Sequence, residues 1–428
     1  MIARATIGLF AWLALTALPS GAAGIPTYSA HDFIDSVGVN THLRHKRSVY
    51  DTQFAALKQK LLDAHIGHIR DGAMDKDGGF HDADASARFA ELGRAGIRAT
   101  FVFRPMAPRE FVQGWPARVA PSFEAYELPN EMNQVKNLPW AETLRVYMPM
   151  FRQYVREGRG GSDYPIVGPS LADVGGNPFA MLGDRSADID FGNVHKYYRA
   201  WNPGVEGYGG KAGDPPCEKY RYGALAYALC RAAIVSGDKP VIVTEAGYAT
   251  GGKPGFFVPP EVQSKYLARL LLLHFAAGVK RTFVYQLADH GSDTGGSMGL
   301  IDQQGGEKPA FRELKALMRE LFDERDAKPA PLDAALDGDV DDVKALSFGK
   351  SDGSYRIVLW LEKAGYDVKT SQPIEVRPQD VRVALGDGFS IRRVVGFADD
   401  GGTRERKPAG ASLAVTDNLT VLDVGRAR

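Results

Sequence analysis

Short apolar runs alternate with longer segments of helical periodicity along most of the chain. Eight apolar runs cover 36–42, 66–72, 97–105, 122–131, 164–171, 189–198, 239–248 and 281–289. Helical patterns, in which apolar residues recur every three or four positions, cover 51–64, 86–96, 140–157, 220–236, 261–277 and 309–326. The stretch between the third and fourth runs reads as poorly helical. Near-continuous apolar runs are typical of parallel strands buried on both faces, so the pattern predicts a (β/α)8 TIM barrel. An open doubly wound sheet is the alternative, but no GxGxxG motif follows the first run.

The pattern changes after residue 327. A linker rich in proline and alanine (328–338) leads into runs whose apolar residues alternate with a period of two. Asp352-Gly353 lies between two such runs and predicts a hairpin turn. The sequence therefore predicts a barrel over 24–327, followed over 328–428 by the linker and a small antiparallel β-sandwich packed on the barrel.

The first 23 residues have the pattern of a secretory signal peptide. Arg4 precedes twelve apolar residues from Ile7 to Leu18, and small residues follow from Ser20 to Gly24. The alternative interpretation is a permanent membrane anchor, but the apolar run is short for one. No later run reaches 18 apolar residues. We therefore expect a secreted or periplasmic protein with no stable membrane insertion.

Composition narrows the possible functions. The chain has 428 residues, of which 44% are hydrophobic, enough for a sizeable core. Its 52 basic and 52 acidic residues balance, which argues against a nucleic-acid-binding protein. In an oxidising compartment Cys217 and Cys230 are expected to form a disulfide. Two cysteines without a matching histidine pair make a poor zinc site, so we expect no metal and no cofactor. We also expect a monomer.

Functional side chains of a barrel lie at the carboxyl ends of its strands. The candidates at those ends are Asn40, His42, Arg70, Asp71, Arg104, Asn130, Glu131, Ser170, His195, Tyr197, Glu245, Gln286 and Asp289. Glu131 and Glu245 stand out, because each closes an apolar strand. The fourth and seventh strands, which carry them, lie roughly opposite each other at the barrel mouth. Such a pair suits glycoside hydrolysis, where a separation of ~5 Å means retention of configuration and ~6.5–9.5 Å means inversion.

Three motifs resemble the clan A glycoside hydrolases: ELPNEMN at the fourth strand, HKYY at the sixth and VIVTEAGY at the seventh. Those enzymes are retaining (β/α)8 hydrolases. The whole layout most resembles glycoside hydrolase family 39 and its exopolysaccharide-degrading relatives, with family 5 next, over about residues 30 to 325. The resemblance implies that Glu131 is the general acid/base and Glu245 the nucleophile. It also implies that Asn130 hydrogen-bonds the sugar 2-hydroxyl.

The resemblance implies supporting roles as well. Arg70 and Tyr197 would hold Glu245 ionised, and His195 would position Glu131 or the substrate. Further predicted substrate contacts are Asn40, Gln286 and Trp201. The sequence departs from the family in two places: the motif reads LPNEM, without the aromatic residue before it and the proline after it, and Gln286 stands where a tryptophan commonly floors the −1 subsite.

Plainer interpretations stay open for these residues. Glu131 can be an acid at a helix N-terminus, Glu245 and Arg70 ion-pair partners, and His195 and Tyr197 core residues. The loop 42–48 carries five basic residues on the catalytic face and either binds an anionic sugar or is simply solvated. Aromatic residues of the loops are candidates for stacking on sugars: Trp115, Trp201, Tyr198, Tyr208, Tyr248, Phe256 and Phe257.

We therefore expect a secreted retaining glycoside hydrolase that cuts within a bacterial exopolysaccharide by double displacement. Its partner is a polysaccharide or an oligosaccharide. The alternatives are an exo-acting β-xylosidase or β-glucosidase, a transglycosylase, and a glycan-binding barrel that has lost catalysis.

Overall fold

The computed structural model describes residues 23–73, 83–158, 160–172, 177–208, 216–252, 255–290, 297–408, 410 and 412–427. Almost all of the predicted signal peptide (1–22) lies outside these ranges, as does part of the long loop after the sixth strand (209–215). Within the described ranges, no helix is both long and apolar enough to cross a membrane.

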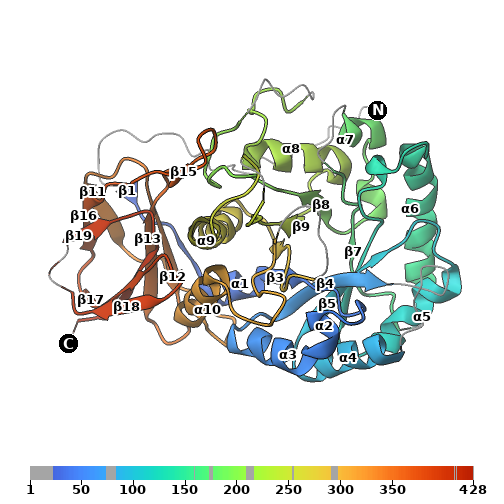
Figure 1. Ribbon diagram of the computed structural model, residues 1–428, viewed down its shortest axis with the longest axis horizontal. Coiled ribbons are helices and arrows are strands. Elements are labelled where there is room, and N and C mark those ends of the chain that lie inside the picture. Colours follow the sequence, from blue (N-terminus) through green and yellow to red (C-terminus); the bar gives the residue numbers. More distant parts are fainter. Residues whose placement is uncertain are drawn as a thin grey trace, which may run out of the picture.

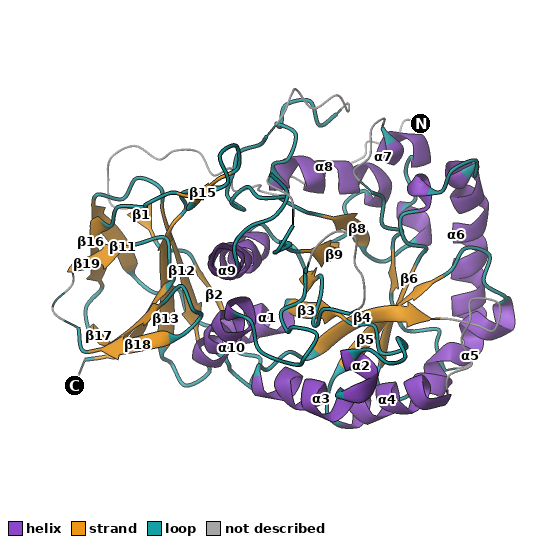
Figure 2. Ribbon diagram, viewed as in Figure 1, coloured by secondary structure: helices purple, strands orange, loops and turns teal. Residues whose placement is uncertain are grey.

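Eight parallel strands form a barrel (Figures 1 and 2). They are β3 (Val37–Asn40), β4 (His68–Ala73), β5 (Arg98–Phe103), β6 (Phe123–Glu127), β7 (Ile166–Val167), β8 (Gly192–His195), β9 (Val241–Ala246) and β10 (Arg281–Val284). The hydrogen-bonded order is β7-β6-β5-β4-β3-β10-β9-β8, and a parallel bridge between Val167 and Phe191 joins its two ends. The predicted TIM barrel is confirmed, and the open doubly wound sheet is excluded.

Helices follow the strands and enclose the barrel (Figure 2). They are α1 (Ala30–Asp35), α2 (Val49–Thr52), α3 (Phe54–Asp63), α4 (Ala83–Arg94), α5 (Arg109–Val119), α6 (Trp140–Glu157), α7 (Pro178–Leu182), α8 (Leu225–Ser236), α9 (Pro260–Ala276) and α10 (Pro309–Leu321), with the 3-10 helices η2 (Met132–Gln134) and η3 (Ser186–Asp188). Helix α6 has the bounds predicted from its periodicity.

One helix contradicts the prediction. The poorly helical stretch between the third and fourth strands contains α5, which has Pro116 inside it. Proline and Gly114 disfavour a helix interior. However, Val112, Trp115 and Val119 are buried on one side of α5, and Trp115 packs against Phe101 of β5. Tertiary packing therefore outweighs the low local propensity.

The C-terminal region is a β-sandwich. Its strands are β11 (Ala334–Gly338), β12 (Val343–Gly349), β13 (Tyr355–Leu361), β16 (Gln379–Leu385), β17 (Phe389–Phe397), β18 (Thr403–Arg406), β19 (Ser412–Val415) and β20 (Thr420–Arg426), beside the small hairpin of β14 (Tyr366–Asp367) and β15 (Gln372–Pro373). Strands β12 and β13 pair antiparallel across the turn that contains Asp352-Gly353, as predicted. The predicted antiparallel sandwich is confirmed.

The N-terminal segment also belongs to the sandwich. Strand β1 (Ala23–Gly24) pairs antiparallel with β11, and β2 (Thr27–Ser29) pairs parallel with β12. The two sheets have the orders β1-β11-β16-β19 and β18-β17-β20-β13-β12-β2. The barrel was predicted to begin at residue 24, but these two strands belong to the sheets of the sandwich. The sequence did not indicate this, because two short edge strands carry no periodicity that would assign them to a distant sheet.

Helices α9 and α10 lie between the barrel and the sandwich (Figure 1). Aromatic rings join the two parts: Phe33 of α1 packs against Phe348 of β12 with centroids 5.2 Å apart. The fully buried Arg269 of α9 donates hydrogen bonds to the backbone oxygens of Asp417 and Lys363, at 3.0 and 2.9 Å. Apolar packing and satisfied polar groups thus fix the sandwich against the barrel wall.

Candidate active site

The two glutamates that the motifs single out lie together at the carboxyl end of the barrel. Glu245 is part of β9, and Glu131 follows β6 in the short loop before η2. Glu131 has a left-handed backbone (φ 45°, ψ 40°), and its N–H donates to the oxygen of Ser170 at 3.0 Å. A non-glycine residue in this region costs roughly 1–2 kcal/mol, and such strain gathers at functional sites.

His195, at the end of β8, lies between the two carboxylates. Its Nδ1 is 2.7 Å from Oε1 of Glu131 and 3.5 Å from Oε2 of Glu245. The ligand atoms of Glu131, His195 and Glu245 all lie within 4.8 Å of one another. One oxygen of each carboxylate therefore lies closer to the other than the about 6.5–9.5 Å that separates the carboxyl groups of inverting glycosidases.

Glu245 is held in its ionised form. Burial alone would raise its pKa, but the positive charges of His195 and Arg70 and the hydrogen bonds from Tyr197 and Arg70 outweigh burial and lower it. Arg70 donates from Nη1 to Oε1 at 2.7 Å, and the Tyr197 hydroxyl donates to Oε2 at 2.8 Å. Burial, reinforced by the charge of Glu245, raises the pKa of Tyr197 well above its usual value, so this hydroxyl keeps its proton.

Arg70 is the centre of a buried network beneath the carboxylates. It forms a two-pronged ion pair with Glu127, with Nε–Oε2 at 2.7 Å and Nη2–Oε1 at 2.8 Å. It also donates to Oδ1 of Asn40 at 2.9 Å and to Oδ1 of Asn130 at 2.7 Å. Burial would lower the pKa of Arg70, but the charges of Glu127 and Glu245 raise it. The guanidinium thus contacts Glu127, Glu245, Asn40 and Asn130 together and fixes their side chains relative to one another.

Glu127 is the site residue that sequence reasoning missed. It is fully buried at the end of β6, and its Oε1 also accepts hydrogen bonds from Asn193 at 3.1 Å and Thr244 at 3.3 Å. A glutamate within an apolar strand was a usable signal, because a buried carboxylate requires a partner. Glu127 lies inside the predicted run 122–131 and not at its carboxyl end, where functional side chains are expected.

Asn130 lies at the exposed edge of this network. Its Oδ1 accepts from Arg70 and from the hydroxyl of Ser170, at 2.7 and 3.1 Å, and the residue is exposed. With the oxygen held by these donors, its amide N–H groups point away from the network. Asn40, in contrast, is buried, and its Nδ2 donates to the backbone oxygen of Thr244 at 3.0 Å. Asn40 therefore supports Arg70 from a buried position.

A cavity of about 260 Å³ adjoins Glu131 on the side of β8. His195, Tyr197, Tyr208 and Arg199 are among the residues that line it. The hydroxyl of Tyr208 donates to the backbone oxygen of Tyr197 at 2.9 Å. The cavity thus extends from Glu131 to the loop that follows β8, and it offers both aromatic and cationic contacts.

The remaining predicted contacts lie further from this cavity. Trp201 stacks on Tyr208 with centroids 5.8 Å apart and planes at 5°, so it supports the ring that lines the cavity. Gln286 is fully buried after β10 and is not among the residues that line the cavity. Among the other loop aromatics, Tyr198 and Tyr248 are fully buried and pack in the core, while Phe256 is 54% exposed.

The glycine of the EAGY motif, which begins at Glu245, has a steric explanation. A Cβ atom at Gly247 would lie 2.5 Å from the backbone oxygen of Tyr285, so only glycine lets β9 approach the segment after β10 this closely. The predicted disulfide between Cys217 and Cys230 is present, with Cα atoms 5.8 Å apart. It joins the end of the long loop after β8 to helix α8.

By residue type, Glu131, His195 and Glu245 also resemble a metal site. However, Oε1 of Glu245 faces the guanidinium of Arg70 at 2.7 Å, and Oε2 accepts from Tyr197. A cation between the carboxylates would have to compete with the arginine. The charge arrangement fits an ionised carboxylate paired with Arg70 better than a metal ligand set.

No protein-family model and no curated protein matches the chain. Solved structures share its fold. The α-L-arabinofuranosidase of Thermotoga maritima, in complex with arabinose, has a TM-score of 0.61 and 10% identity, covering 95% of this chain and 98% of that one. The GH51 α-L-arabinofuranosidase of Thermotoga petrophila RKU-1 has a TM-score of 0.54 and 11% identity, with the same coverage. Both matches span barrel and sandwich together, and both proteins are glycoside hydrolases by name.

Proposed function

We propose that the protein is a retaining glycoside hydrolase, exported from the cell, that cuts within a bacterial exopolysaccharide. The observation that carries the proposal is the approach of Glu131 and Glu245 across the barrel mouth, where one carboxylate oxygen of each lies within 4.8 Å of the other. This separation suits double displacement rather than an inverting reaction, which needs room for a water molecule between the carboxylates.

In the first step the carboxylate of Glu245 attacks the anomeric carbon. The glycosidic bond breaks, and the proton of Glu131 passes to the leaving oxygen, which departs as a hydroxyl group. The product is a covalent glycosyl ester of Glu245. Arg70 and Tyr197 keep Glu245 ionised before the attack.

In the second step Glu131, now a carboxylate, takes a proton from water. The resulting oxygen nucleophile attacks the anomeric carbon, releases Glu245 and restores the original configuration. His195 positions Glu131 at 2.7 Å throughout. Asn130 donates its free amide to the sugar 2-hydroxyl, a contact that strengthens in the transition state.

The substrate class rests on the sequence motifs, which most resemble family 39 and its exopolysaccharide-degrading relatives. The names of the structural neighbours favour glycosidic substrates in general, since both are arabinofuranosidases. Export rests on the signal-like N-terminus and agrees with the disulfide.

The test measures product release from a panel of bacterial and plant polysaccharides, with product sizes determined. Wild type is compared with Glu131→Gln, Glu245→Gln and, as a matched control, Glu142→Gln on the exposed face of α6. We expect the control to keep full activity and both site variants to lose it by more than about 100-fold while remaining folded. Full activity in either site variant would refute that residue's role.

Azide separates the two roles. With an activated aryl glycoside, Glu131→Ala should form the glycosyl ester and pass it to azide with retained configuration. Glu245→Ala should instead accept azide in the vacated space and give the inverted product. Exchanged outcomes would reverse the assignment. Monosaccharide products would favour an exo-acting β-xylosidase or β-glucosidase, transfer to added glycans would favour a transglycosylase, and binding without cleavage by all variants would favour a glycan-binding barrel.

A further inference from the structure

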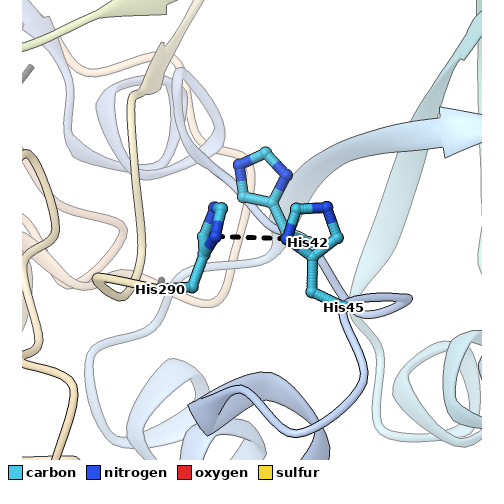
Figure 3. Close-up of side chains that lie close together, drawn as sticks. All are labelled: His42, His45 and His290. Atoms are coloured by element: carbon cyan, nitrogen blue, oxygen red, sulfur yellow. Dashed lines mark hydrogen bonds between the residues drawn. The ribbon is translucent and has the colours of Figure 1, made fainter. Parts of the chain in front are cut away.

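A second cluster of chemically active side chains lies at the same end of the barrel, outside the carboxylate site. His42 and His45 belong to the loop between β3 and α2, and His290 follows β10 (Figure 3). One ring nitrogen from each of the three lies within 4.8 Å of the others. Nδ1 of His45 is 3.1 Å from Nδ1 of His290.

The three rings converge from two different loops. Ring centroids are 4.3 Å apart for His42 and His290, 4.4 Å for His45 and His290, and 5.0 Å for His42 and His45. Two imidazole ligands of a tetrahedral zinc ion, each at about 2.0–2.1 Å from the metal, lie about 3.3 Å from each other. The His45–His290 distance is close to that value.

A hydrogen bond between two of the histidines does not account for the third. Nε2 of His42 is buried and has no hydrogen-bond partner within the described part of the chain. A buried polar nitrogen without a partner is costly and calls for an explanation, such as a bound ion. A neutral imidazole with an unpaired nitrogen is the form of histidine that binds metals.

The backbone that presents the cluster is fixed on both sides. Oδ2 of Asp71 accepts from the hydroxyl of Thr41 at 2.8 Å and from the N–H of Leu43 at 2.9 Å, which are the two neighbours of His42. On the other loop, Oδ1 of Asp289 accepts from the N–H of Gly299 at 2.6 Å. The ligands are therefore held before any ion arrives, which lowers the cost of binding.

Local charges act in both directions. Arg44 lies near His42 and opposes a cation. The negative charge of the buried Asp71, beneath the loop, partly offsets the positive charge of Arg44. Imidazole ligands favour zinc, copper or nickel over magnesium or calcium, and three neutral histidines form the most familiar open zinc site.

We propose that His42, His45 and His290 form a three-histidine zinc site that ties the loop after the first barrel strand to the segment after the eighth. The fourth coordination position is left for water or a hydroxyl group. The ring of His42 lies 5.7 Å from that of Tyr285, so the ion stands beside the wall of the barrel mouth. The site is separate from the two carboxylates and does not depend on the proposed hydrolase function.

The test titrates metal-stripped full-length mature protein, carrying no histidine tag, with ZnCl2 in a calorimeter. We expect one equivalent to bind to wild type, and Co2+ to give the visible absorption bands of a tetrahedral complex. His290→Gln and His45→Gln should each weaken binding by more than about 100-fold. The control His31→Gln changes a histidine of a different, exposed cluster and should leave the titration unchanged.

Thermal unfolding provides a second readout. Zinc should raise the Tm of wild type and of His31→Gln but not that of His290→Gln, because only a folded site gains from the ion. Circular dichroism shows whether the variants are folded, and His42→Asn serves if one of them is not. No zinc binding by wild type, or binding that survives in two of the three site variants, would overturn the proposal. Loss of binding in Glu245→Gln alone would place the ion at the carboxylates and overturn it as well.

Discussion

A buried carboxyl group between α9 and α10 allows a quantitative prediction about stability. Glu313 of α10 is fully buried, and the hydroxyl of Ser264 on α9 donates to its Oε2. Burial raises the pKa of Glu313 to about 7, although Ser264, Arg269 and Lys265 lower it in part. The folded protein therefore holds this proton up to a pH at which the unfolded chain has released it.

The sign and the size of the effect follow from proton binding. In the unfolded chain the carboxyl titrates near its usual value of 4.5. Between pH 4.5 and 7 the folded state binds more protons than the unfolded state, so stability falls as the pH rises through this window. At about 1.4 kcal/mol for each pH unit, the penalty reaches about 3 kcal/mol above pH 7.

Glu313→Gln keeps the shape of the protonated acid and cannot ionise. We expect the variant to equal wild type near pH 4 and to exceed it by up to about 3 kcal/mol at pH 8. Urea unfolding followed by tryptophan fluorescence at both pH values gives the difference, with Glu142→Gln as the exposed control. A stability difference that is the same at both pH values, or a variant that is less stable at pH 8, would refute the reasoning.

Other consequences can be measured separately. Tyr197→Phe removes a hydrogen bond to ionised Glu245, which is worth about 1.5–3 kcal/mol. The acidic limb of the pH profile of kcat/KM should therefore move up by about 1–2 pH units. A limb that does not move would contradict the contact. Arg70→Met leaves its buried carboxylate partner without a counter-charge and should cost about 3–5 kcal/mol in urea unfolding, and a loss below about 1 kcal/mol would argue against the network. Replacing Cys217 and Cys230 by alanine should cost up to about 3 kcal/mol, and reduced wild type should match that variant.

The barrel could be predicted because its strands are short and buried on both faces. Each strand is therefore an apolar run, and each helix keeps one apolar stripe against the sheet. Helix α5 could not be predicted because Gly114 and Pro116 weaken its local signal while packing of Trp115 supplies the stability. The placement of β1 and β2 in the sandwich could not be predicted for a different reason, because pairing between the two ends of the chain leaves no local pattern in the sequence.

The site divides in the same way. Glu131, Glu245, His195 and Tyr197 lie at strand ends, where the barrel fold alone indicates function, and the structure brings them together. Gln286 follows a strand end too, yet it is fully buried. A strand end therefore predicts the neighbourhood of a residue but not the direction of its side chain.

The histidine cluster marks a stricter limit. His42 and His45 stand in a loop that reads as basic and solvated, and their third partner lies about 245 positions further along the chain. Only closure of the barrel between β3 and β10 brings them together. A ligand set of this kind has no spacing that a sequence pattern could reveal.

The buried charges beneath the site give a reason for the position of Glu127. Arg70 carries one positive charge and faces two carboxylates, those of Glu127 and Glu245. In the proposed mechanism Glu245 loses its charge when it becomes an ester, and Arg70 and Glu127 then remain as a balanced pair. If Arg70 faced Glu245 alone, it would stabilise the free carboxylate in full and slow its attack, since only interactions that are stronger in the transition state accelerate a reaction. Because Glu127 shares the guanidinium, Arg70 can keep Glu245 ionised without holding back its reactivity.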